Sequence, residues 1–195
     1  LSDGKIHTIF NQTLTRTGRL SSMDPNLQNI PVREELGRKV RIAFVPENDY
    51  ILSSDYSQIE LRLMAHISDS KDLKDAFIHG EDIHRKVASD IYGVPLEDVT
   101  KNMRSTAKAV IFGIIYGISG YGLGENLNIS KSEADEFIKK YYELYPGVKK
   151  YMDDTIRTTK ETGYVKTLFG RVRKIDEIKN SNFMVRQMGE RMALN

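Results

Sequence analysis

Apolar residues recur every three or four positions through much of this 195-residue chain, which is the spacing of amphipathic helices. Within residues 103–117, for example, Val110, Ile111, Ile114 and Ile115 share one apolar face. The pattern predicts helices over residues 58–67, 70–78, 83–92, 96–117, 132–145, 147–162 and 182–195. A glycine-rich stretch at 117–124 is expected to end the longest of them.

Shorter alternating or purely apolar runs predict a few strands. Residues 5–12 alternate, residues 50–54 form a short apolar run, and residues 163–175 are typical of a hairpin with Gly170 near its turn. Residues 15–31 are rich in Ser, Thr, Asn, Gly and Pro, so we expect a loop there. The predicted fold class is therefore α+β and mostly helical.

Composition and charge limit where this protein is expected to act and what it is expected to bind. The chain has no cysteine, no apolar run long enough to span a membrane and no visible signal peptide, so we expect a cytoplasmic protein without membrane contact. Residues 146–195 carry eleven Lys or Arg against six Asp or Glu, whereas residues 46–100 carry five against twelve. Basic segments can neutralise the phosphates of a nucleic acid. Ordinary surface charge explains a balance this modest equally well.

One stripe of the predicted helix within 96–117 combines cations with aromatic rings. Arg104, Lys108, Phe112 and Tyr116 lie four positions apart. Like charges one turn apart weaken an isolated helix, so helix stability alone gives no reason for them. A bound nucleoside triphosphate would explain these cations, because its phosphates would pair with them and its base and sugar would pack against the rings. The alternative is an amphipathic helix with a solvated cationic edge.

Three further segments accompany this stripe. They read Thr-Gly-Arg-Leu-Ser-Ser at 17–22, Asp-Pro-Asn-Leu-Gln-Asn-Ile-Pro at 24–31 and Asp-Tyr-Ser-Gln-Ile-Glu-Leu-Arg at 55–62. Together they resemble the bacterial family A DNA polymerases, and the similarity runs along essentially the whole chain. The resemblance implies an internal piece of a longer, monomeric enzyme of DNA replication and repair. It implies part of a palm at 1–66, inserted helical fingers at 67–146 and a return toward the palm at 147–195.

The resemblance places metal chemistry directly after the apolar run 50–54. Asp55 would be one of two aspartates that hold Mg²⁺, and the backbone carbonyl of Tyr56 would help to hold one ion. Phosphoryl transfer needs such a cation to neutralise the triphosphate, and carboxylates bind it. Without the resemblance, Asp55 would be interpreted as the cap of the following helix.

For the incoming deoxynucleoside triphosphate (dNTP), the resemblance implies a role for each member of the stripe. Arg104, Lys108 and His84 would bind the phosphates. Phe112 would pack against the sugar and base, and Tyr116 would lie where the template base enters. Taken alone, His84 is more simply a histidine at a helix N-terminus with no ligand.

Glu60 has two compatible interpretations. Residues 57–60 form a capping-box pattern, in which Glu60 reaches back to the Ser57 amide. In the family, the matching glutamate lies under the sugar of the nucleotide and blocks a 2′-hydroxyl. That role would select deoxyribonucleotides, and it argues against a single-subunit RNA polymerase as the alternative.

Further polar side chains are candidates for contact with primer–template DNA. By resemblance or by their basic character, these are Arg19, Asn26, Asn29, Arg33, Arg171, Arg173, Arg186 and Arg191. Phosphate contacts fix position without reading sequence, as copying any template requires. Each arginine alone can equally form a surface salt bridge, and a non-catalytic nucleic-acid-binding module is a second alternative function.

The sequence also departs from the family pattern. Ile111 replaces an asparagine, Ser105 replaces a frequent second arginine, and Lys-Ile-Asp at 174–176 replaces a Tyr-Leu-Pro-type run. We expect Ile111 to point away from the stripe and to alter packing more than binding. The family's second catalytic carboxylate, in a His-Asp-Glu turn, does not occur in these 195 residues. We therefore expect this segment alone not to polymerise.

Overall fold

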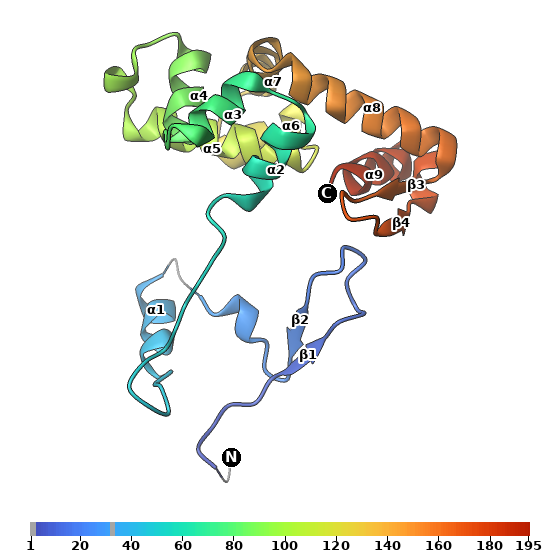
Figure 1. Ribbon diagram of the computed structural model, residues 1–195. Coiled ribbons are helices and arrows are strands. Elements are labelled where there is room, and N and C mark those ends of the chain that lie inside the picture. The colour runs from blue at the N-terminus through green and yellow to red at the C-terminus, as the bar shows by residue number, and fades with distance from the viewer. Residues whose placement is uncertain (1–2, 32–33) are drawn as a thin grey trace. The chain divides into compact units, whose positions relative to one another are not determined.

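The computed structural model describes residues 3–31 and 34–195, and the chain divides into two compact units, Leu1–Tyr56 and Ser57–Asn195 (Figure 1). In the first unit, β1 (Ile9–Asn11) pairs antiparallel with β2 (Ser21–Met23). A short 3₁₀ helix, η1 (Leu27–Asn29), and α1 (Glu35–Ile42) follow.

Several predictions for the first unit are wrong. Only residues 9–11 of the predicted strand 5–12 are paired, and the predicted loop 15–31 contains β2. No helix was expected where α1 lies. Residues 50–54 form no strand, because no described segment pairs with them, and Leu52 is 93% exposed. A strand needs a partner for its backbone groups as well as an apolar sequence.

The second unit is mostly helical and is built around α5 (Lys101–Ile115). That helix packs against α4 (Ile83–Tyr92), α6 (Gly120–Leu127) and α7 (Lys131–Leu144). The remaining helices of this bundle are α2 (Ile59–Ile67), α3 (Lys71–Ile78) and the 3₁₀ helix η2 (Leu96–Asp98). Figure 1 shows these helices lying together, with α5 next to α4 and α6.

The long helix α8 (Pro146–Thr162) leads from α7 to the last elements of the chain. These are β3 (Tyr164–Lys166), β4 (Val172–Lys174), the 3₁₀ helix η3 (Asp176–Lys179) and α9 (Phe183–Leu194). The predicted hairpin is confirmed: β3 pairs antiparallel with β4, and Gly170 in the turn has φ +87°. The predicted final helix is confirmed as well.

Polar side chains define where most helices of the second unit begin. Accepting side chains cap the N-termini of α4, α5, α6, α7 and α9, and they belong to Asp82, Thr100, Ser119, Ser130 and Asn182. The cap at Thr100 explains why the predicted helix 96–117 is divided into η2 and α5. The glycine-rich stretch does end α5, but it then enters α6, a helix that was not predicted.

A large apolar core stabilises the helical part of the second unit. Val87, Val110, Leu123 and Val148 come from four different helices and are completely buried. Ile111 is 1% exposed, so the prediction that it points into the protein, away from the stripe, is confirmed. No helix in the part of the chain that the structure describes is long and apolar enough to cross a membrane.

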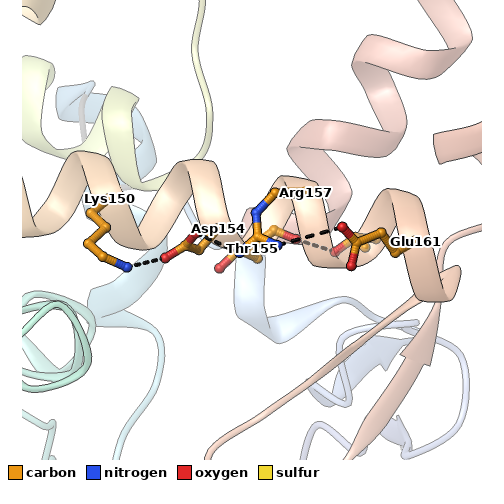
Figure 2. Close-up of polar contacts among 6 residues, drawn as sticks. Lys150, Asp154, Thr155, Arg157 and Glu161 are labelled. Carbon is orange, nitrogen blue, oxygen red and sulfur yellow. Dashed lines mark hydrogen bonds and ion pairs between the residues drawn. The ribbon is translucent and has the colours of Figure 1, made fainter.

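The exposed side of α8 carries a ladder of ion pairs (Figure 2). Lys150 pairs with Asp154, Arg157 Nη2 lies 2.9 Å from Asp154 Oδ1, and Arg157 Nη1 lies 3.6 Å from Glu161 Oε1. Ion pairs three and four residues apart support a helix, although water screens exposed pairs and keeps each contribution small. The ladder therefore helps α8 to stay helical where water rather than protein surrounds it.

Candidate nucleotide-binding site

The burial of α5 leaves the predicted stripe accessible. Residues Val110, Ile111, Ile114 and Ile115 face the core, as an amphipathic helix requires. On the stripe itself, the side chains range from exposed at its N-terminal end to half-buried at its C-terminal end; they are Arg104, Lys108, Phe112 and Tyr116. The cations therefore meet solvent, while the rings are held against the protein.

Aromatic contacts connect the stripe to α4. The rings of Phe112 and Tyr116 stack with centroids 6.5 Å apart, and Lys108 Nζ lies 6.0 Å from the centroid of the Phe112 ring. The His84 ring stacks on Phe112 from α4, with centroids 6.0 Å apart and an interplanar angle of 28°. The structure thus brings His84 to residues that lie more than twenty positions away in the sequence.

Glu60 reaches the same place from α2. The Tyr116 hydroxyl donates a hydrogen bond of 2.7 Å to Glu60 Oε2. The predicted capping box is wrong: α2 begins after Gln58, whose φ is +53°, and no side chain caps its first turn. The same observation excludes Asp55 as the cap of α2. Glu60 is instead fixed by a residue 56 positions away.

His84 is buried and unusually placed for a polar side chain. It is 4% exposed, and neither ring nitrogen has a hydrogen-bond partner among the described residues. Burial lowers the pKa of His84, the positive charge of Arg104 lowers it further, and nearby Asp82 opposes the shift. The imidazole is therefore neutral at pH 7, and its free nitrogens are available to a ligand.

Asp82 joins this cluster, although the sequence did not single it out. Its Oδ2 accepts a 2.7 Å hydrogen bond from Arg104 Nε, and its Oδ1 accepts one of 3.2 Å from the Arg85 amide. Burial alone would raise the pKa of Asp82, but these two hydrogen bonds hold it below its usual value. An Asp before a helix can be recognised from the sequence as a capping residue, whereas its pairing with Arg104 cannot be.

The end of the stripe is held by a close approach of α9. Gly117 follows Tyr116 with φ +67°, a conformation that favours glycine. A Cβ on Gly117 would lie 3.1 Å from Leu194 Cδ1 and 3.3 Å from Arg191 Cγ. Glycine at this position therefore lets α9 pack directly against the turn that follows Tyr116.

The predicted metal ligands lie in the first unit. Asp55 and Tyr56 are exposed, and their carboxylate and carbonyl oxygens are donors that suit Mg²⁺. Within residues 3–31 and 34–195, no three His, Asp or Glu side chains come close enough together to hold a metal ion.

The candidate DNA-binding residues fall into two groups. Some already make structural contacts: Asn26 accepts a hydrogen bond from the Gln28 amide, Arg173 Nη1 donates to the carbonyls of Met192 and Asn195, and Arg186 Nη1 donates to that of Asn180. Arg19, Asn29, Arg171 and Arg191 have exposed side chains, and Arg19 also interacts with another part of the protein. Arg33 lies outside the described residues.

A helix face that carries cations and stacked aromatic rings has the chemistry to bind a nucleotide. The family model of DNA polymerase family A matches residues 1–195. The chain therefore belongs to DNA polymerase family A.

The matches to individual relatives cover 98–99% of the chain. It is 58% identical over 194 residues to DNA polymerase I of Geobacillus stearothermophilus and 56% identical over 195 residues to that of Lactococcus lactis. A solved structure, the POL domain of Pol1 from M. smegmatis in complex with DNA primer-template and dNTP, matches with a TM-score of 0.92 and 46% identity. It covers all of this chain and 35% of that one. The chain spans 22% of the length of the two DNA polymerase I relatives.

Proposed function

We propose that this chain supplies the fingers and part of the palm of a template-directed DNA polymerase. The reaction joins a dNTP to a primer 3′-hydroxyl and releases pyrophosphate. One observation carries the proposal: the stripe on α5 is met by His84 from α4 and by Glu60 from α2. Family membership and the solved relative with primer-template and dNTP support it.

The contacts suggest which part of the nucleotide each of these residues binds. Arg104, Lys108 and the unpartnered nitrogens of His84 bind the triphosphate. Phe112, stacked between His84 and Tyr116, packs against the sugar and base. Tyr116 stacks where the template base enters, and Glu60 beneath it excludes a ribose 2′-hydroxyl. Closing this helical element over a correct pair would couple binding to fidelity.

The rest of the chain serves the same reaction in this proposal. Residues 1–66 belong to the palm, 67–146 form the fingers and 147–195 return toward the palm. Asp55 and the Tyr56 carbonyl provide part of a Mg²⁺ site, and the remaining carboxylate comes from elsewhere in a monomeric, cytoplasmic polymerase. Exposed side chains such as Arg19 and Arg171 contact the primer–template backbone. The isolated segment is expected to be inactive.

Replacing Lys108 tests the triphosphate site. In the complete polymerase bound to a dideoxy-terminated primer–template, Lys108→Ala should weaken dNTP binding about 10- to 100-fold, because a charge-assisted contact is lost. Lys101→Ala, an exposed cation in the first turn of α5, is the matched control and should bind normally. Duplex binding that ignores dNTP in both variants would favour the non-catalytic binding module instead.

Replacing Glu60 tests the selection of the sugar. Glu60→Ala should let the polymerase incorporate ribonucleotides about tenfold or more better relative to dNTPs, because the obstacle to the 2′-hydroxyl is removed. Glu60→Gln keeps the size of the side chain and should retain most of the selection. Glu125→Ala, exposed on α6, is the control. An unchanged sugar preference in Glu60→Ala would exclude the steric role.

A further inference from the structure

Asp82 contacts the cation cluster, but the proposed function gives it no role. Its two carboxylate oxygens are used separately: Oδ1 caps α4 through the Arg85 amide, and Oδ2 accepts from Arg104 Nε at 2.7 Å. Because this cap holds the carboxylate at the start of α4, the position of the Asp82 side chain is fixed before any ligand binds. Asp82 links α4 to the first turns of α5.

The contact with Asp82 leaves the terminal nitrogens of the Arg104 guanidinium free to bind a ligand. Arg104 donates its hydrogen bond to Asp82 through Nε, and its two terminal nitrogens make no hydrogen bond with the residues that the structure describes. Those two nitrogens form the edge with which a guanidinium binds phosphate oxygens in parallel. A contact at Nε therefore orients the guanidinium without occupying the part that would bind phosphate.

We infer that Asp82 is a positioning residue for Arg104, which holds the guanidinium so that its terminal nitrogens face the nucleotide triphosphate. This inference rests on the proposed function. Holding a flexible side chain before the ligand arrives reduces the ordering cost of binding. The Arg104 and Asp82 side chains are 44% and 38% exposed, so water screens the pair and the expected effect is moderate.

Serine at position 82 separates positioning from helix capping. Asp82→Ser keeps an N-cap side chain for α4 but removes the acceptor for Arg104, and Asp82→Asn does the same with a side chain of similar size. In the complete polymerase with a dideoxy-terminated primer–template, both should weaken dNTP binding about three- to tenfold. Thermal unfolding should be unchanged. Asp98→Ser, an exposed carboxylate in η2, is the control and should bind dNTP normally.

A double-mutant cycle decides whether Asp82 acts through Arg104. In an Arg104→Ala background, Asp82→Ser should cause no further loss of dNTP affinity. An equal loss in both backgrounds would mean that Asp82 acts through another group, such as His84, whose Nδ1 lies 3.8 Å from Oδ1, and would overturn the inference.

The two proposals fail in different ways. If Arg104→Ala itself binds dNTP normally, the triphosphate site is misplaced and the proposed function fails. If Arg104→Ala weakens binding while both Asp82 variants bind normally, the triphosphate site stands and only the positioning role is overturned.

Discussion

The two units of this chain differ in how far they bury their apolar side chains. In Ser57–Asn195, the helices share a core in which residues such as Val87 and Val110 are completely buried. In the described part of Leu1–Tyr56, Ser22 is the buried residue, while Ile9 and Phe10 are each 56% exposed. Burial of apolar surface is the main stabilising term in folding, and it acts in the second unit, whereas the described part of the first unit has no fully buried apolar side chain.

This difference bears on the site. The proposed nucleotide-binding residues stand on α2, α4 and α5, which the core holds in fixed positions. The proposed metal ligands, Asp55 and Tyr56, lie at the end of a unit held mainly by short polar contacts, such as the one between Thr8 and Ser22. The proposed nucleotide-binding residues are therefore held in place within their own unit.

The largest effect is expected from a substitution in the core of the second unit. Ile114→Ala should lower the free energy of unfolding by about 2–5 kcal/mol, because Ile114 is 2% exposed and its loss leaves a cavity. Ile9→Ala in β1 is the matched substitution and should change it by less than about 0.5 kcal/mol. Urea unfolding of the chain measures both. Similar losses in the two variants would contradict the contrast between the units.

A smaller effect tests the close packing of α9. A Cβ on Gly189 would lie 2.6 Å from the Ile178 nitrogen and 2.8 Å from the Glu177 carbonyl carbon, both backbone atoms of η3. Gly189→Ala should therefore destabilise the second unit by about 1–3 kcal/mol, although alanine favours helices. Thermal unfolding measures the change, with exposed Met188→Ala as the control. A stabilised Gly189→Ala variant would show that this contact is looser.

The smallest expected effect concerns pH. Burial, aided by the charge of Arg104, lowers the pKa of His84 below the ordinary 6.5, so the unfolded chain binds this proton first as the pH falls. The stability that neutral His84 contributes is thus complete above about pH 6.5 and is lost as the pH drops through the folded-state pKa. His84→Gln should flatten this acid decline in urea unfolding. His66→Gln, exposed on α2, should not; an equal flattening would contradict the prediction.

Local patterns were enough for much of the second unit. The period of apolar residues predicted most of its helices, because that period records which face of each helix meets the core. It also predicted that Ile111 is buried and that Arg104, Lys108, Phe112 and Tyr116 share one accessible face. The same reasoning failed at residues 50–54, because strand formation depends on a partner that the pattern does not contain.

The sequence by itself determined the helical periodicity, the hairpin around Gly170 and the stripe on α5, since each depends on residues within one or two turns of each other. Only the tertiary structure decided that Glu60 bonds Tyr116 rather than its own helix cap, that His84 stacks on Phe112 and that Asp82 holds Arg104. Those contacts join side chains from separate helices. Their geometry follows from how the core packs those helices together, which no local pattern specifies.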